Sequence, residues 1–413
     1  MRTLEGAAAR SSVSTLANRA DDLDKVSNKV RRIVGDVRRD RDRALRRYAQ
    51  RWDGLDENQA AQVDPAEISS AWRQVSSEFR SALRRAAANV RQFAAWQKPK
   101  AWIQTQNGIS VGQIIRPLTS VGCYVPGGRY PLPSTLLMTV IPAQVAGVKR
   151  ICVVSPQPRI ETLAAAALLG IRELHRVGGA QAIAALAYGT ETIPRVDKIV
   201  GPGNVYVIAA KKFVAFDCSI DFLAGPTEIV IVSHRGKPLM IASDLVAQAE
   251  HDPQAVIVFI TTSRQLARNV ATSVTSLAGN NPIARRSLAD KGVILLASSR
   301  GEAMDWANRL APEHITLDPQ DLPLLRNAGS VFVGDYSPTA AGDYGSGPNH
   351  VLPTGGLARC RGGLSVSDFL KVITVQRLTK TGLRGIAPVL ETLAEAEGLT
   401  AHAQSVRVRY ANA

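Results

Sequence analysis

The stretch "ELHRVGGAQAIAALAYG" (173–189) and the stretch "VDKIVGPGNVYVIAAKKFVAF" (196–216) decide the fold class. Each begins with a short apolar run, passes through a turn that contains glycine, and continues into a segment rich in alanine, leucine or valine. This order predicts a βαβα unit. Short apolar strands without polar alternation are typical of a parallel sheet that is covered on both faces.

The same pattern extends outward in both directions. It begins near residue 118 and is repeated in a second series of apolar runs: "EIVIVSH" (228–234), "AVIVFITT" (255–262), "GVILLASS" (292–299) and "SVFVG" (330–334). Residues 20–100 predict helices, and a strand-like "KVITVQRLT" (371–379) precedes a helical tail. The sequence therefore predicts two α/β units in tandem, the second of which shares its body with the N-terminal helices.

Bulk composition is that of a soluble protein. The 413 residues are 45% hydrophobic and 21% charged, and the four cysteines are scattered without a CxxC pair. Scattered cysteines indicate reduced thiols rather than disulfides. The N-terminus lacks the apolar core of a signal peptide, and the longest apolar run (134–155) is broken by Pro142 and by Lys149-Arg150. We therefore expect a cytoplasmic protein with no membrane partner.

Much of the net charge of +15, about one third, sits in "RRIVGDVRRDRDRALRRY" (31–48). In this stretch apolar residues fall at helical spacing and arginines lie between them, which predicts the solvated face of an amphipathic helix. Aromatic content is only 5%, and no nucleic-acid-binding motif is present. We expect no nucleic-acid partner.

Three glycine-containing loops follow predicted strands: "VPGG" (125–128), "VGGAQ" (177–181) and "GPGN" (201–204). In parallel α/β sheets, ligands bind outside the carboxyl ends of the strands, where glycine lets the backbone approach a phosphate. The loops are placed for a dinucleotide, although the GxGxxG fingerprint is missing.

Histidines with polar neighbours are the candidates for chemistry. In "AQAEHDPQA" (247–255), Gln248 and His251 are placed on one face of a helix that should end at Asp252-Pro253. The loop "AGDYGSGPNHVLPTGG" (341–356) carries Asp343 and His350 among five glycines. These residues suggest a site for a divalent ion such as zinc. The residue pattern alone does not decide which of His314, His350 and His402 is a further ligand. It also does not decide whether Gln248 or Glu250 binds the ion.

The dipeptide Glu313-His314 in "LAPEHITL" (310–317) offers a second kind of chemistry. A histidine is a suitable general base near neutral pH, and a carboxylate can activate water. His175 and His234 do not stand in a comparable motif and are interpreted as structural.

From about residue 25 to the C-terminus, the chain resembles the histidinol dehydrogenase family. The motifs that carry the resemblance are "VGCYVPGG", "PAQVAGVK", "VGGAQAIAALAYGTETIPRVDKIVGPGN", "AGPTE", "LVAQAEHDP", "APEHITL", "GDYGSGPNHVLPTGG" and "AEGLTAHAQSVRVR". Each motif alone is weak, but so many in order and at the family's spacing are specific.

The resemblance implies an enzyme that uses NAD and zinc to oxidise L-histidinol to L-histidine through an aldehyde, in the last steps of histidine biosynthesis. By residue, it implies zinc ligands at Gln248, His251, Asp343 and His402, which with His314 also face the substrate. It implies a catalytic pair at Glu313 and His314, further substrate contacts at Thr227, His350 and Glu397, and NAD contacts at Tyr124, Gln181 and Asn204.

The resemblance also implies two incomplete Rossmann-like parallel-sheet domains in a homodimer with shared active sites. By this expectation, residues 1–22 are an N-terminal segment, 23–122 and 228–365 form a discontinuous first domain, and 123–227 form the NAD-binding domain. The tail, 366–413, is swapped, so that His402 and Glu397 complete the partner's active site.

Two positions depart from the family pattern. Thr227 stands in "AGPTE" where serine is common, which adds a methyl group to the substrate pocket. Arg129 in "GCYVPGGRYP" resembles a sister group that oxidises sulfonated diols such as sulfopropanediol, since an arginine can pair with a sulfonate. The stretches "PEHITL" and the tail motif favour histidinol. Cys123, beside Tyr124, is interpreted as a small buried residue.

Overall fold

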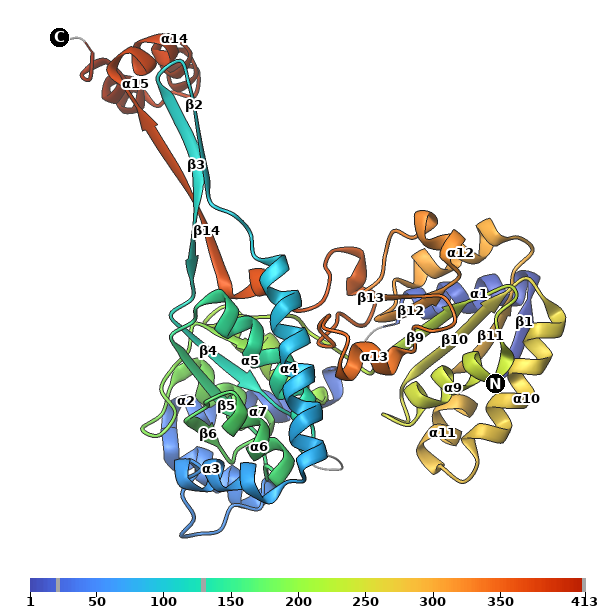
Figure 1. Ribbon diagram of the computed structural model, residues 1–413. Coiled ribbons are helices and arrows are strands. Elements are labelled where there is room, and N and C mark those ends of the chain that lie inside the picture. Colours follow the sequence, from blue (N-terminus) through green and yellow to red (C-terminus); the bar gives the residue numbers. More distant parts are fainter. Residues whose placement is uncertain (20–22, 128–130, 411–413) are drawn as a thin grey trace.

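The computed structural model describes residues 1–19, 23–127 and 131–410. Two α/β bodies and a projecting arm make up the chain, and the C-terminal helices lie at the far end of the arm (Figure 1). Among the described helices, none is long and apolar enough to cross a membrane.

A five-stranded parallel sheet forms the centre of the first body, in the order β6-β5-β4-β7-β8. The chain runs from β4 outward to β6 and then returns to the other side of β4, which is the strand order of one half of a Rossmann fold. The strands are β4 (Ser120–Tyr124), β5 (Arg150–Val154), β6 (Glu173–His175), β7 (Lys198–Val200) and β8 (Ser219–Ile220). The helices between and after them are α5 (Pro133–Ala146), α6 (Ile160–Leu168), α7 (Gly179–Tyr188) and α8 (Val205–Val214).

Three N-terminal helices cover this first body: α2 (Asp24–Trp52), α3 (Pro65–Gln74) and α4 (Ser77–Gln97). Helix α2 packs against α7 and α8, α3 against α6, and α4 against α5. The prediction that residues 23–122 share a body with 228–365 is therefore wrong. The physical reason is that α7 is buried all round, so it needs a further helix outside it, and the apolar stripe of α2 supplies that cover.

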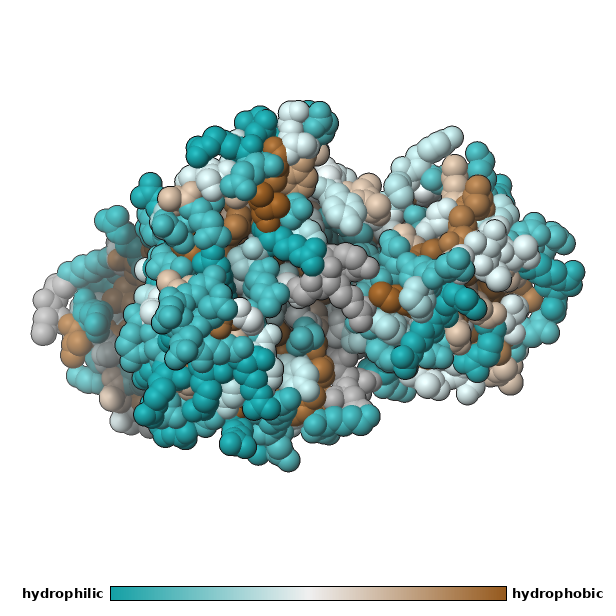
Figure 2. Space-filling view, turned by 90° about the horizontal axis from the view of Figure 1, so that it is seen from below, coloured by the Kyte–Doolittle hydropathy of each residue, from teal (hydrophilic) through white to brown (hydrophobic). Residues whose placement is uncertain are grey.

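The outer side of α2 is solvated, as its arginine pattern predicts. Arg39, Arg43 and Arg47 are exposed and form surface ion pairs with Asp36 and Asp40. Seen from below, the first body presents a mostly hydrophilic surface (Figure 2).

A six-stranded parallel sheet forms the second body, in the order β1-β11-β10-β9-β12-β13. Its last five strands repeat the order of the first sheet. The strands are β1 (Arg2–Glu5), β9 (Glu228–Val232), β10 (Val256–Thr261), β11 (Gly292–Leu296), β12 (His314–Leu317) and β13 (Ser330–Val333). The helices are α1 (Gly6–Ala17), α9 (Pro238–Ala249), α10 (Arg264–Ala278), α11 (Pro282–Asp290), α12 (Arg300–Leu310) and α13 (Thr339–Tyr344), with the short 3-10 helix η1 (Pro319–Leu324).

The N-terminal residues belong to this second body. Strand β1 pairs with β11 in parallel, and α1 packs against α12. The prediction of a separate N-terminal segment is wrong for residues 1–19, because the apolar side chains of Ala9 and Val13 are fully buried in the core of the second sheet. Residues 20–22 lie outside the described part of the chain.

The arm is an antiparallel sheet of β2 (Trp102–Gln106), β3 (Ile109–Pro117) and β14 (Leu370–Leu378), and it ends in α14 (Lys380–Ala396) and α15 (Thr400–Arg407). Asn107 and Gly108 join β2 to β3, and both have positive φ, as a two-residue hairpin turn requires. The predicted strand and helices of the tail are confirmed. The β2–β3 hairpin was not foreseen, and it connects the tail to the first body (Figure 1).

Candidate active site

Glu313 and His314 lie at the amino end of β12, directly after a turn in which Ala311 is left-handed. Both side chains are buried. The carboxylate oxygen Oε2 of Glu313 accepts hydrogen bonds from the backbone N–H of Glu228 at 2.8 Å and from the Thr227 hydroxyl at 2.5 Å. His314 Nδ1 lies 3.2 Å from the backbone oxygen of Glu228, so it is the nitrogen that donates there. The predicted pair is thus held in one orientation by the residues that begin β9.

The imidazole of His314 lies between two carboxylates. Its Nδ1 is 3.4 Å from Glu313 Oε2, and its Nε2 is 3.7 Å from Asp343 Oδ1. Burial lowers the pKa of His314, but the charges and hydrogen bonds of Glu313 and Asp343 outweigh burial and raise the pKa to about 10. Burial raises the pKa of Asp343, yet His314, His350 and His251 together lower it below its usual value. His314 and Asp343 therefore each stabilise the charged form of the other.

Candidate zinc ligands converge from two helices. Gln248 is buried in the last turn of α9, His251 is exposed just beyond that helix, and α13, which carries Asp343, packs against α9. The amide of Gln248 donates to the Thr227 hydroxyl, which links the metal candidates to Glu313. The helix ends at Ala249, close to the predicted stop.

The donor types fit zinc, which accepts imidazole nitrogen and carboxylate or amide oxygen. His251 lines one cavity together with Tyr344 and Gly345, the two residues that follow Asp343. However, the described residues of one chain contain no group of three or more His, Cys, Asp or Glu side chains that could hold a metal ion. The packing of α13 against α9 thus places Gln248, His251 and Asp343 in the same part of the second body.

His402 and Glu397 are not part of this cluster. His402 lies on α15 and Glu397 directly follows α14, and both are exposed. These helices stand at the far end of the arm, away from β12 and α13 of the same chain (Figure 1).

His350 connects the glycine loop to the first body. Its Nδ1 lies 2.8 Å from the backbone oxygen of Asp343, and its Nε2 lies 3.3 Å from the hydroxyl of Thr135 on α5. Burial lowers the pKa of His350, so its imidazole stays neutral at neutral pH. The loop brings Asp343 and His350 together, as expected for a site, whereas the contact with Thr135 had no signal in the sequence.

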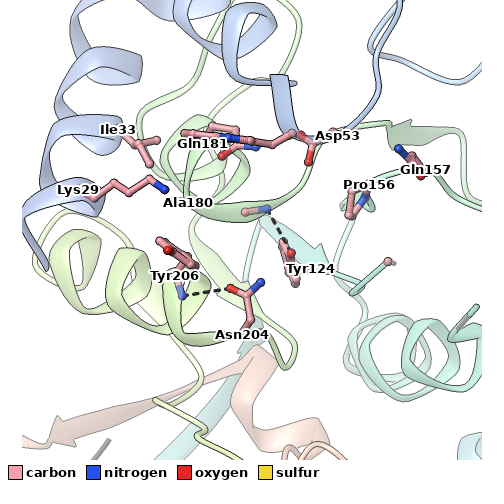
Figure 3. Close-up of a pocket in the computed structure, with 13 residues that line it drawn as sticks. Lys29, Ile33, Asp53, Tyr124, Pro156, Gln157, Ala180, Gln181, Asn204 and Tyr206 are labelled. Atoms are coloured by element: carbon pink, nitrogen blue, oxygen red, sulfur yellow. Dashed lines mark hydrogen bonds between the residues drawn. The ribbon is translucent and has the colours of Figure 1, made fainter. Parts of the chain in front are cut away.

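The predicted NAD contacts line one cavity of about 330 Å³ at the carboxyl edge of the first sheet (Figure 3). Tyr124 ends β4, Gln181 lies in the first turn of α7, and Asn204 caps α8. The hydroxyl of Tyr124 accepts a hydrogen bond of 3.2 Å from the N–H of Gly179. The cavity lies where the strand order reverses between β4 and β7, which is the usual ligand position in such sheets.

Sequence reasoning missed the part of this cavity that comes from α2. Asp53 accepts hydrogen bonds of 2.9 Å from the N–H of Gly178 and from the amide of Gln181. Lys29 lies over the rings of Trp52 and Tyr206, at 5.3 and 5.0 Å. The Asp53 contacts join segments 125 and 128 residues apart, and nothing local in the sequence marks them.

Two further positions have different outcomes. Cys123 is fully buried, and burial raises the pKa of its thiol to about 12, so its interpretation as a packing residue is confirmed. Arg129 lies outside the described residues.

A buried carboxylate–imidazole pair on one Rossmann-type sheet and a ligand-sized cavity at the switch point of another are the arrangement of a two-domain α/β enzyme that performs acid–base chemistry. Sequence comparison narrows this class to one family. The profile of histidinol dehydrogenase matches residues 16–410, and the chain belongs to the histidinol dehydrogenase family of oxidoreductases.

Relatives and a solved structure agree with this assignment over nearly the whole chain. A histidinol dehydrogenase of Methanothermobacter thermautotrophicus is 48% identical and covers 96% of each chain. One of Geobacter sulfurreducens is 45% identical and covers 91% of each. The crystal structure of histidinol dehydrogenase from Elizabethkingia anophelis is 35% identical, with a TM-score of 0.93 over 100% of this chain and 98% of that one.

Proposed function

We propose that the protein is an NAD- and zinc-dependent dehydrogenase that oxidises L-histidinol to L-histidine through L-histidinal. When bound, NAD would supply the hydride acceptor for both oxidations, from alcohol to aldehyde and from hydrated aldehyde to acid. The observation that carries the proposal is the buried Glu313–His314 pair, which Glu228 and Thr227 hold by hydrogen bonds, with Gln248 bonded to Thr227 and Asp343 3.7 Å from His314.

In this proposal, a cation held beside Asp343 would offset the carboxylate charges that raise the pKa of His314. The neutral imidazole would then take the alcohol proton through Nε2, because Nδ1 is already engaged with the backbone oxygen of Glu228. Glu313 then removes a proton from the water that adds to the aldehyde carbon. Thr227 and His350 contact the substrate from either side of Asp343. Tyr124, Gln181 and Asn204 hold NAD at the edge of the first sheet. Retaining the aldehyde between the two steps keeps a reactive intermediate out of solvent.

Gln248, His251 and Asp343 hold zinc in this proposal, with His402 as the fourth ligand. When bound, the ion orients the substrate's imidazole and amino group and supplies positive charge beside Asp343. The residues of the chain carry out the proton transfers themselves.

The fourth ligand is proposed to come from a second copy of the chain in a homodimer with shared active sites. Large apolar side chains on the arm are exposed in the single chain, including Ile103, Val372, Val389, Leu393 and Leu399. A three-stranded sheet with so much exposed apolar surface needs a partner in water. Exchange of arms would bring the partner's His402 and the partner's Glu397 to the site.

The experiment that tests the substrate compares L-histidinol with sulfopropanediol, using NADH formation by the zinc-loaded protein. We expect NADH from L-histidinol, no comparable rate from the sulfonated diol, and a loss of at least about 100-fold in the His314→Ala variant, as is typical of a missing general base. Turnover of the diol alone would assign the chain to the sister activity, with Arg129 the first residue to replace.

A further inference from the structure

Glu228, the first residue of β9, contacts the catalytic pair through its backbone and its side chain. Its N–H donates to the Glu313 carboxylate at 2.8 Å, and its backbone oxygen lies 3.2 Å from His314 Nδ1. Its own carboxylate accepts from the N–H of Glu313 at 3.3 Å and from the N–H of Gly355 at 2.9 Å. A single buried residue thus holds both members of the pair and the end of the glycine loop.

The negative charge of Glu228 is balanced by Arg19, the residue two positions beyond α1. The Nε and Nη2 atoms of Arg19 donate to the two oxygens of Glu228, each at 2.5 Å. The guanidinium also donates to the backbone oxygens of Leu16, at 2.6 Å, and Leu310, at 3.0 Å. Arg19 therefore links the C-terminal ends of α1 and α12 to the carboxylate of Glu228. Helix α12 ends at Leu310, shortly before Glu313.

We propose that Arg19 and Glu228 form a buried ion pair that positions the Glu313–His314 dipeptide for catalysis. Both are positioning residues, because their side chains bind each other and backbone groups rather than the reacting atoms. The inference rests on the proposed function and adds a role for the N-terminal end of the chain, which contributes no residue to the site itself.

Loss of Arg19 should act on the catalytic pair specifically. A carboxylate left buried without its partner must take up a proton or move towards water. Either change weakens the hydrogen bonds that the N–H groups of Glu313 and Gly355 donate, and it shifts the start of β9, on which His314 and Glu313 both depend.

A matched control, a second ion pair, lies at the carboxyl ends of the strands of the second sheet. Arg300 Nη2 lies 2.5 Å from Asp321 Oδ1, and Asp321 is fully buried in η1, after the carboxyl end of β12. Breaking this pair also leaves a buried carboxylate without its arginine, but none of its hydrogen bonds leads to Glu313 or His314.

The experiment compares Arg19→Met, Arg19→Lys and Arg300→Met in the full-length, zinc-loaded protein. We expect Arg19→Met to lower kcat for L-histidinol at least tenfold, with KM for NAD and zinc content within twofold of wild type. Arg19→Lys should recover part of kcat, because it restores the charge. Arg300→Met should lower the melting temperature without this loss of kcat.

A second readout does not depend on activity. Hydrogen exchange should show loss of protection at the amides of Glu228, Glu313 and Gly355 in Arg19→Met and not in Arg300→Met. Equal kcat and equal exchange in the two variants would overturn the positioning role. If wild type forms no NADH from L-histidinol, the proposed function fails, while the exchange comparison still decides whether the ion pair orders the dipeptide.

Discussion

The hydroxyl group of Thr227 connects two parts of the candidate site. It accepts a hydrogen bond from the amide of Gln248 and donates one to Glu313, so it joins the proposed zinc ligands to the catalytic carboxylate. A threonine can make both bonds as well as a serine, and the additional methyl group changes only the shape of the pocket. The departure from the family's usual serine therefore leaves the network intact.

Replacing Thr227 by valine should lower kcat by about 10- to 100-fold, because Glu313 and Gln248 both lose a hydrogen-bond partner in a buried site. Thr227→Ser is the matched control, and it should stay within a few-fold of wild type. Steady-state kinetics with L-histidinol make the comparison. Equal activities of the valine and serine variants would show that the hydroxyl carries no catalytic role.

His175, at the end of β6, makes stability depend on pH. It is 1% exposed, neither ring nitrogen has a hydrogen-bond partner among the described residues, and burial lowers its pKa to about 4. The unfolded chain binds this proton near pH 6.5. The contribution of His175 to stability is therefore complete above pH 6.5 and is lost as pH falls towards 4.

Between pH 7.5 and pH 5, this one histidine should reduce the free energy of unfolding by about 2 kcal/mol. Urea denaturation of wild type and His175→Leu at both pH values measures the effect. The decrease between the two pH values should be smaller in the variant by that amount. The same pH dependence in both proteins would mean that His175 is not the responsible group.

Among the elements, the loop after β7 is supported by a buried ion pair. Lys211 on α8 donates to the backbone oxygen of Gly201 at 2.5 Å and to Asp221 at 2.7 Å, and Asp221 accepts from the N–H of Gly201 at 2.7 Å. Gly201 has φ of 116°, and a Cβ atom there would lie 2.1 Å from the backbone oxygen of Tyr124. Glycine is therefore required, and the ion pair fixes the turn that leads to Asn204.

Lys211→Met should raise KM for NAD about tenfold with little change in kcat, because the loop that carries Asn204 loses its support while the Glu313–His314 pair is untouched. The variant should also be less stable than the double variant Lys211→Met/Asp221→Asn, in which no charge is left buried alone. A change confined to kcat would contradict the assignment of this edge to NAD.

Elements with strong local patterns could be predicted from the sequence. The apolar runs that became β9, β10 and β11, the end of α9 after Gln248, and the three glycine loops all carry their signal within a few residues. The β2–β3 hairpin was missed although Asn107-Gly108 is a strong turn signal, because its strands lie outside the α/β pattern. Asp53, Thr135 and Glu228 could not be found this way, since their roles arise from contacts made about 80 to 215 residues away.

Across the whole molecule, the two sheets share a strand order, but their candidate sites lie at opposite ends of the strands. The cavity proposed for NAD lies at the carboxyl ends of the strands of the first sheet, whereas Glu313, His314 and Glu228 lie at the amino ends of strands in the second. The switch-point rule predicts the first position and not the second. The resemblance to a family supplied the predicted residues of the second site, and in the single chain α15, with His402, and the end of α14, next to Glu397, stand apart from β12 and α13 (Figure 1).

Shared sites make a specific prediction for mixed dimers. Chains with His314→Ala and chains with His402→Ala should each be inactive alone. After subunit exchange, each mixed dimer has one site with both lesions and one with neither, so activity should recover to about a quarter of wild type if exchange is random. No recovery, with exchange demonstrated by differently tagged chains, would contradict the contribution of His402 across the dimer.

The zinc-dependent oxidation of L-histidinol to L-histidine is tested most directly by the number of NADH molecules formed per molecule of L-histidinol, with limiting substrate and excess NAD. We expect two NADH per histidinol, with activity abolished by a zinc chelator and restored by added zinc. One NADH per histidinol with release of the aldehyde, or activity that is indifferent to zinc removal, would contradict it.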